Sequence, residues 1–514
     1  MSFQSFGYFL FLPVVALCFL NLPHRLQSPF LLAASLFFYG WNRPAAAGPL
    51  LQWLPMAVLA AETLFVWRAG LRLAKAEKKG RVLAGCIVLL LAVLALFKYY
   101  NALVVPISPL LPQALRRLPF PLGISFYSFA AISYLVDVSR NDLEPAPRFW
   151  DLASFLCFFG TITSGPICRA RDVLPQLGQP QRFDEGRTVS ALRLFALGLF
   201  KKVAVADALG MVVGQIYGDL AGHGGPALLL ALVLYTLQLY FDFCGYSEMA
   251  RASALLLGIR IPDNFKTPFF ATNFSGFWSR WHISLSSWLQ DYLFTPLVWA
   301  DVSKVPLLGR RVQRFSPVFC VFLVFFLSGF WHGNTLPFVV WGLFQGLCRA
   351  GEEVMHQTLG KPKKKAPLRH IWAKRAAVFC LWTLGMAFFS AGSGVGGTGT
   401  LHDALLLLGG IFQNWSPARF GSEIWQAVHS GFYANSLMAG AYLVFVTLAL
   451  ALAFWLDWLR FARFKSKPAE EVLAAQSKGR RWVLYYALVL FLLAGFIMQS
   501  GGFSGLNMGI YAGF

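Results

Sequence analysis

One histidine stands in an apolar stretch where polar side chains are costly. Residues 315–348 contain no Asp, Glu, Lys or Arg, are bounded by arginines, and carry His332 between Gly329 and Gly333. If both bounding arginines are cytoplasmic, the stretch is a hairpin with His332 at its apex, and the glycines let the helix end there. A neutral imidazole shielded from water can take a proton from a hydroxyl nucleophile, which is general-base catalysis. The structural alternative is a histidine that bonds a carbonyl and ties two helices together.

A second group of polar residues lies near the end of a long apolar segment. Gln238, Asp242 and Tyr246 are spaced four residues apart, so they share one face of a helix. An amide, a carboxylate and a phenol in one row are typical of the wall of a polar cavity. The alternative is structural, with Asp242 capping a helix or pairing with an arginine.

A third group lies in residues 261–296, which mix polar with aromatic side chains and are too polar to span a membrane. Trp and Tyr anchor such segments at the membrane surface, so we expect an interfacial helix here. The alternative is that the segment folds into the protein and lines a tunnel for a large polar substrate, with Arg280 meeting a phosphate. The candidate lining residues are Arg280, Trp281, His282, Ser284, Asp291 and Tyr292.

These three groups must be positioned by helices that cross a membrane. The 514-residue chain is 57% hydrophobic and only 13% charged, which is about half the charged fraction of a soluble protein. One span needs about 20 mostly apolar residues. The apolar runs and their Pro and Gly interruptions predict about eleven spanning helices plus re-entrant or interfacial helices. We therefore expect one all-α polytopic membrane domain over residues 1–514.

The distribution of charge predicts the orientation of these helices. The net charge of +21 is concentrated near residues 68–81, 304–314, 361–375 and 460–481, and the positive-inside rule places these loops in the cytoplasm. Three crossings precede the first loop and one follows the last, so both termini are expected outside. Short basic loops suit anionic lipid and not a nucleic-acid groove. The eight cysteines form no CxxC pair, so no metal site is expected.

In combination, these residues resemble the motifs of one known family. The run 280–286 (RWHISLS), the pair Asp291 and Tyr292, the triplet 331–333 (WHG) and the pair Trp341 and Gly342 resemble motifs of membrane-bound O-acyltransferases. The resemblance covers most of the chain, and with its length it points to the bacterial alginate O-acetyltransferase branch. The further matching segments, in chain order, are 38–41, 121–126, 165–167, 198–202, 238–246 and the aromatic residues up to Phe514.

The resemblance implies a helical body around a central tunnel in a bacterial inner membrane. The outer side, where the charge distribution places both termini, is then the periplasm. It implies that His332 is catalytic and that Trp331, Asn334 and Gln345 line the substrate path. No bound cofactor is expected: acetyl-CoA is the donor substrate, and its acetyl group passes across the membrane. In this branch a periplasmic SGNH-type partner, with a polysaccharide synthesis and secretion complex, places the acetyl group on sugar hydroxyls.

Three residues depart from the family pattern. Gln345 stands where many relatives have a second histidine, and Gln cannot exchange a proton at neutral pH, which argues against a proton relay there. Gly276 and Glu248 also differ, so the polymer can be alginate, cellulose or a capsular polysaccharide.

Two alternative functions remain open on the sequence alone. One is transfer of another acyl group, such as D-alanine from a carrier protein to a teichoic-acid-type polymer. The other is a non-enzymatic transporter of a polysaccharide or lipid-linked sugar. Such transporters often have paired broken helices, whereas this chain has one concentrated break, at residues 328–335.

Overall fold

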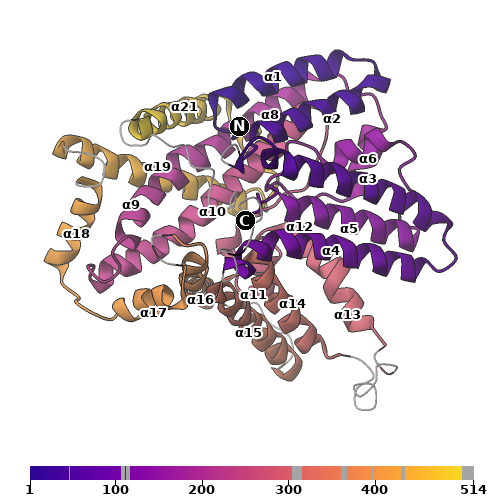
Figure 1. Cartoon of the computed structure of the whole chain (residues 1–514). Helices are drawn as coiled ribbons and strands as arrows, with labels where there is room; N and C mark the ends of the chain where they lie inside the picture. Colours follow the sequence, from indigo (N-terminus) through magenta and orange to yellow (C-terminus); the bar gives the residue numbers. More distant parts are fainter. Residues whose placement is uncertain are drawn as a thin grey trace. The chain divides into compact units, whose positions relative to one another are not determined.

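The computed structural model describes residues 1–44, 47–105, 110, 116–301, 303, 315–359, 367–395, 397, 399–429 and 435–500. Within these ranges every regular element is a helix (Figure 1), as the sequence predicts. The basic loop 304–314, residues 361–366 of the next basic loop, and the C-terminus lie outside the described residues. The chain forms two compact units, one of residues 1–196 and 246–263 and the other of residues 197–245 and 264–510.

The first unit packs long apolar helices around α5. Every residue of α5 from Ile124 to Val138 is buried, and its Ser and Ala residues are small enough for α3 and α4 to pack closely against it. Gly123, just before α5, has a φ of 75°, and a Cβ there would lie 1.7 Å from the carbonyl oxygen of Ile162. Glycine is therefore required where α5 begins. The helices are α1 (Phe6–Asn21), α2 (His24–Trp41), η2 (Leu51–Trp53), α3 (Leu54–Lys75), α4 (Lys79–Leu103), α5 (Ile124–Arg140), α6 (Phe149–Leu156) and α7 (Ala170–Leu177).

The second unit is built on the hairpin of α14 and α15, which packs against α16. Two helices, α8 (Glu185–Leu199) and α10 (Gly225–Leu256), carry residues of both units. The other helices are η5 (Phe200–Asp207), α9 (Ala208–Tyr217), η6 (Pro268–Phe270), α11 (Phe274–Trp278), α12 (Ile283–Leu289), η7 (Gln290–Phe294), α13 (Thr295–Trp299), α14 (Pro317–His332), α15 (Leu336–Leu359), α16 (Leu368–Gly392), α17 (Leu401–Gly410), α18 (Pro417–His429), α19 (Ser436–Ala462), α20 (Ala469–Ala474) and α21 (Lys478–Ser500).

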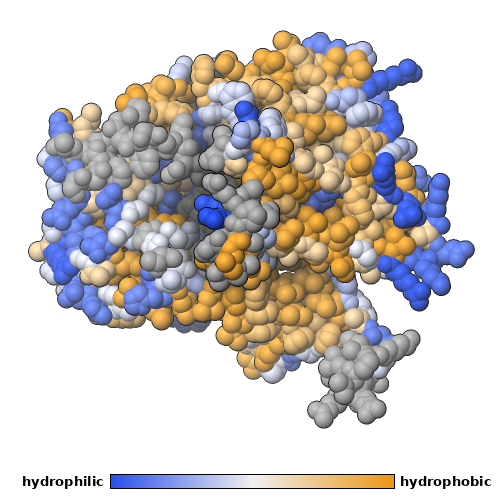
Figure 2. Space-filling view, viewed as in Figure 1, coloured by the Kyte–Doolittle hydropathy of each residue, from blue (hydrophilic) through white to orange (hydrophobic). Residues whose placement is uncertain are grey.

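Six helices among the described residues are long and apolar enough to cross a membrane. They are Leu51–Lys75, Lys79–Leu103, Gly225–Leu256, Leu368–Gly392, Ser436–Ala462 and Lys478–Met498. Shorter apolar helices include α1 and α14, so the predicted total of about eleven spans stays a prediction. Large apolar side chains face outward on these helices, for example Val88 of α4 (66% exposed) and Leu490 of α21 (65% exposed). Figure 2 shows broad apolar areas on the surface, which suits contact with lipid.

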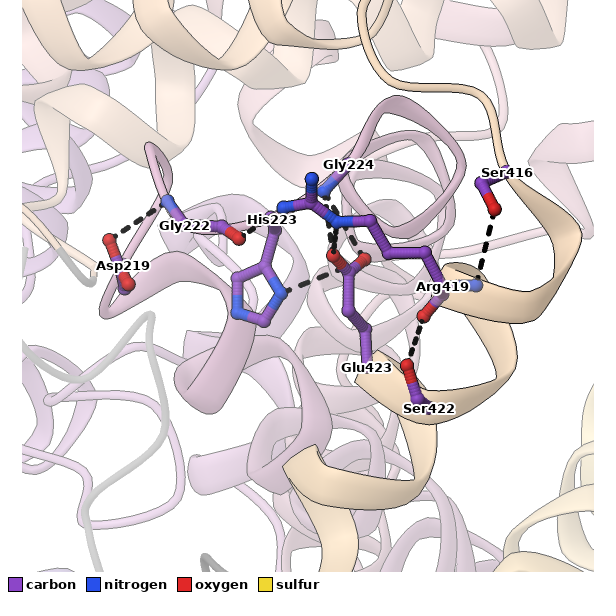
Figure 3. Close-up of polar contacts among 8 residues, drawn as sticks. All are labelled: Asp219, Gly222, His223, Gly224, Ser416, Arg419, Ser422 and Glu423. Atoms are coloured by element: carbon purple, nitrogen blue, oxygen red, sulfur yellow. Dashed lines mark hydrogen bonds and ion pairs between the residues drawn. The ribbon is translucent and has the colours of Figure 1, made fainter.

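A polar clamp joins α18 to the turn between α9 and α10 (Figure 3). Glu423 on α18 accepts hydrogen bonds from the backbone N–H of Gly224 at 3.1 and 3.2 Å and pairs with Arg419 at 2.5 Å. The Nδ1 atom of His223 lies 3.9 Å from the same carboxylate, and Arg419 also donates to the carbonyl of Gly222. The clamp fixes the beginning of α10, the helix that carries the second polar group.

Candidate active site

His332 is the last residue of α14 and lies in a cage of aromatic rings. It is 4% exposed, and its ring centroid lies 4.8 Å from Trp341 at 86° and 5.1 Å from Phe389 at 77°. Phe338 lies nearly parallel to the imidazole at 6.1 Å. Helices α14, α15 and α16 each contribute to this cage, so the packing of three helices positions the imidazole. Such a water-poor setting suits general-base chemistry at a hydroxyl group.

The turn after His332 explains why the imidazole can face inward. Gly333 is extended and ends α14, as predicted from the paired glycines, and Thr335 donates to the carbonyl of Gly392 at 3.4 Å. That bond ties the turn of the hairpin to the end of α16. Asn334, a predicted lining residue, is exposed in this turn. Trp331, half-buried, places its ring 4.7 Å from the imidazole of His332.

The third polar group folds into the second unit instead of lying flat as one interfacial helix. Trp281, His282 and Ser284 are 2%, 1% and 2% exposed, and the segment is broken into the short helices α11 and α12. The interfacial expectation is therefore wrong for this part of the segment. The Trp281 ring packs 4.8 Å from Trp382 of α16. The segment therefore supplies aromatic residues to the core as well as polar residues.

Asn264, which the sequence analysis did not identify, organises the polar part of this segment. Its Oδ1 accepts from the Ser284 hydroxyl at 2.6 Å and from the Ser284 N–H at 3.1 Å, and lies 3.3 Å from Nδ1 of His282. The His282 ring meets Phe243 edge-on at 4.6 Å and lies 6.5 Å from Trp331. Burial lowers the pKa of His282 to about 3, so it is neutral at pH 7. Nothing in an unaligned sequence marks Asn264 for this role.

The other residues of the third group lie at its two edges. Asp291 and Tyr292 lie on η7, a π-helix, and both are half-buried. The Tyr292 ring packs 5.4 Å from Trp288. Arg280, between α11 and α12, is half-buried, with its guanidinium carbon 5.7 Å from the ring centroid of Phe461 on α19. Tyr292 therefore packs within the segment, whereas Arg280 packs against α19.

The second polar group is divided among three structural roles. Asp242 pairs with Lys202 of η5 at 2.7 Å. This ion pair is the structural alternative expected for Asp242, except that its partner is a lysine and not an arginine. Gln238 packs against Gly210 of α9. A Cβ added at Gly210 would lie 2.6 Å from Nε2 of Gln238. Tyr246 belongs to the first unit, where its hydroxyl bonds that of Thr163. A shared helix face therefore does not make these residues one site.

Lys202 and Lys201 form a buried ionic network that the sequence analysis did not assign. Lys202 lies 2.6 Å from Asp207 as well as 2.7 Å from Asp242, and Lys201 lies 3.8 Å from Asp457 of α19. Both lysine side chains are at most 6% exposed. Adjacent lysines inside an apolar helix were the available signal, because unpaired charges are not tolerated there.

Gln345 lies in the same helix bundle as His332. It is fully buried on α15 and faces Gly385 of α16, where an added Cβ would lie 2.6 Å from its Nε2. Neither side-chain amide atom of Gln345 has a hydrogen-bond partner among the described residues, nor do the indole N–H groups of Trp341 and Trp382. Buried donors without partners are costly, so these groups are suited to bind a polar substrate.

The chain resembles known proteins over most of its length. Residues 37–393 match the MBOAT, membrane-bound O-acyltransferase family. The probable alginate O-acetylase AlgI of Pseudomonas putida is 32% identical over 96% of this chain and 95% of that protein. The corresponding protein of Azotobacter vinelandii is 34% identical over 74% of this chain and 73% of its own length. The peptidoglycan O-acetyltransferase of Helicobacter pylori is 30% identical over 66% of this chain and 68% of its own length. This polytopic membrane protein therefore belongs to the membrane-bound O-acyltransferase family.

Proposed function

We propose that this chain takes acetyl from acetyl-CoA at the cytoplasmic face and passes it across the membrane for O-acetylation of a polysaccharide. The observation that carries the proposal is the burial of His332 in a cage of aromatic rings at the end of an apolar hairpin. The names of the relatives support acetyl as the group transferred, since they are an alginate O-acetylase and a peptidoglycan O-acetyltransferase.

His332 acts as the general base in this proposal. Its imidazole accepts the proton of the acceptor hydroxyl as that oxygen attacks the thioester carbonyl. A C–O bond forms and the C–S bond breaks. The departing thiolate then takes the proton from the imidazolium, so the step is balanced without a further reactant. Trp341, Phe338 and Phe389 exclude water, which protects the thioester from hydrolysis.

The final acceptor in this proposal, reached after the acetyl group has left the site at His332, is a polysaccharide outside the cytoplasm, such as alginate or cellulose. A periplasmic SGNH-type partner, within a synthesis and secretion complex, receives the acetyl group and places it on sugar hydroxyls. The chain lies in the bacterial inner membrane with both termini in the periplasm. The basic residues at the start of α16 and the end of α19 support this orientation.

The test uses the purified protein in sealed proteoliposomes with acetyl-CoA labelled in its acetyl group. We expect labelled acetyl to reach an oligosaccharide acceptor only when an SGNH-type partner protein is present on the opposite side. Failure of acetyl-CoA to serve as donor, with efficient transfer from a D-alanyl carrier protein, would favour the alternative acyl group.

The same proteoliposomes separate a transferase from a transporter. A transporter moves a labelled oligosaccharide or lipid-linked sugar across the membrane without any acyl donor. A transferase leaves that sugar in place and moves only the acetyl label. Movement of the sugar without a donor would contradict the proposal.

A further inference from the structure

Two arginines from different parts of the second unit meet at one aromatic ring. The guanidinium carbons of Arg280 and Arg375 lie 5.7 and 5.0 Å from the ring centroid of Phe461. Arg280 precedes α12, Arg375 lies near the start of α16, and Phe461 lies at the end of α19. Three segments far apart in the sequence therefore bring two positive charges together.

Within the described part of the chain, no carboxylate pairs with these two converging cations. Among the ion pairs of the described residues, none joins Arg280 or Arg375 to an acidic side chain. The Nη1 atom of Arg280 is buried and has no hydrogen-bond partner within the described part of the chain. Burial, and then the positive charge of Arg375, lower the pKa of Arg280, as expected for two guanidinium groups held close to each other. An anion between them would relieve their mutual repulsion.

Aromatic rings hold the pair in place. Phe270 stacks on Phe461 at 4.6 Å and 10°, and its carbonyl accepts from Nε of Arg375 at 3.2 Å. Trp372 lies one turn before Arg375, with its ring centroid 4.8 Å from the guanidinium carbon. Stacking restrains Arg375 and leaves its terminal nitrogens available for a planar, two-pronged contact.

A continuous series of rings leads from this pair toward His332. Trp281, the residue after Arg280, packs 4.8 Å from Trp382, which lies 5.5 Å from Trp278. Trp278 lies 6.3 Å from Trp341, and Trp341 lies 4.8 Å from His332. The indole N–H groups of Trp278, Trp341 and Trp382 have no hydrogen-bond partner among the described residues. Such donors suit the amide carbonyls of a pantetheine arm.

We propose that Arg280 and Arg375 form a phosphate-binding site for the nucleotide end of the acyl donor, with the ring series receiving its pantetheine arm. This inference rests on the proposed function, because it assumes a donor whose thioester is reached by His332. Guanidinium groups bind phosphate oxygens in pairs. The phosphate of a lipid headgroup would bind the two guanidinium groups in the same way. The experiment therefore distinguishes a phosphate of the acyl donor from a phosphate of a lipid.

The experiment compares two donors with the same thioester. Acetyl-CoA carries phosphates, whereas S-acetyl-pantetheine carries none. With the protein in phosphatidylcholine nanodiscs, we expect R375Q to raise the KM for acetyl-CoA about tenfold to hundredfold, as expected for loss of a charged hydrogen-bonded pair, with a much smaller change in kcat. The same variant leaves kcat/KM for S-acetyl-pantetheine at the wild-type value. K374Q, which removes the exposed neighbouring charge on α16, is the matched control and leaves both donors unaffected.

The outcomes distinguish this site from the proposed function. Equal losses with both donors in R375Q would assign Arg375 a structural role and overturn the site. A wild-type protein that binds CoA and inorganic pyrophosphate in an Arg375-dependent manner, yet transfers no acetyl, would keep the site and reject the proposed function. If R375Q instead loses only phosphatidylglycerol bound from mixed nanodiscs, while the KM for acetyl-CoA is unchanged, the ligand is a lipid and the proposal is wrong.

Discussion

Gly329 of α14 and Gly342 of α15 pack backbone against backbone one turn before His332. A Cβ added at Gly342 would lie 2.9 Å from the Cα atom of Gly329 and 2.6 Å from the carbonyl oxygen of Phe325. No side chain separates the two helices at this point. The contact places Trp341, the residue before Gly342, against the imidazole of His332.

The G342A variant tests whether this close approach positions the active site. The added methyl group forces the helices apart, and such overpacking costs about 1–3 kcal/mol. We expect a lower Tm and a lower transfer rate, measured by thermal unfolding in detergent and by acetyl transfer. G351A on the same helix is the control, because Gly351 has open space around it and Ala favours helix. Equal behaviour of the two variants would contradict the account.

The Q345L variant tests whether the buried amide serves the substrate. Leu has a similar volume and removes an amide that has no partner among the residues the structure describes. Such a buried group costs about 1–3 kcal/mol. We expect a higher Tm together with about tenfold slower turnover, as for the loss of one hydrogen bond in the transition state. Q357L, at an exposed position of the same helix, should change neither. A stabilised Q345L enzyme with full activity would make Gln345 a packing residue only.

The K202M variant tests the buried ionic network. It leaves Asp207 and Asp242 without their shared cation, and breaking a buried pair costs about 3–5 kcal/mol. We expect a large drop in Tm, mostly recovered in the triple variant K202M/D207N/D242N. The exposed pair of Lys467 and Glu471 provides the control, since K467M should change stability by no more than about 0.5 kcal/mol. An unchanged Tm in K202M would show that the network is dispensable.

His282 predicts a pH dependence of stability. Its pKa is about 3 in the folded protein and about 6.5 when unfolded, so the unfolded state takes up a proton between these values and the folded state does not. Stability is therefore lost as pH falls below about 6.5, by at most about 1.4 kcal/mol per pH unit, and is unaffected above it. H282N keeps a residue that tolerates the positive φ of 43° at this position. Between about pH 7 and pH 5 its Tm should fall less than that of the wild type; identical slopes would refute this assignment.

Part of this architecture could be predicted from sequence. Apolar runs predict the spanning helices, and the glycines around His332 predict the end of α14. Both features depend on the local sequence. The mixture of polar and aromatic residues in 261–296 predicts an interfacial helix. In the structure, however, Trp281 packs against α16 and His282 packs against α10, and both are buried. Periodicity within one segment cannot show which distant helix will cover it.

The polar partners were also beyond the reach of sequence alone. Asp242 is four residues from Gln238 and Tyr246, yet its partner Lys202 lies forty residues earlier in the chain. Asn264, which fixes His282 and Ser284, has no distinguishing feature in an unaligned sequence. Long-range pairing depends on tertiary packing, which helix spacing does not encode.

The most direct test of the account is the rate of acetyl transfer by H332Q, compared with H402Q at an exposed histidine of α17. Gln fills a similar space but cannot accept the hydroxyl proton at neutral pH. We predict that H332Q keeps the wild-type Tm and loses about 10²–10⁴-fold in rate, while H402Q transfers acetyl normally. A wild-type rate in a folded H332Q protein would contradict the role of His332 as the catalytic base.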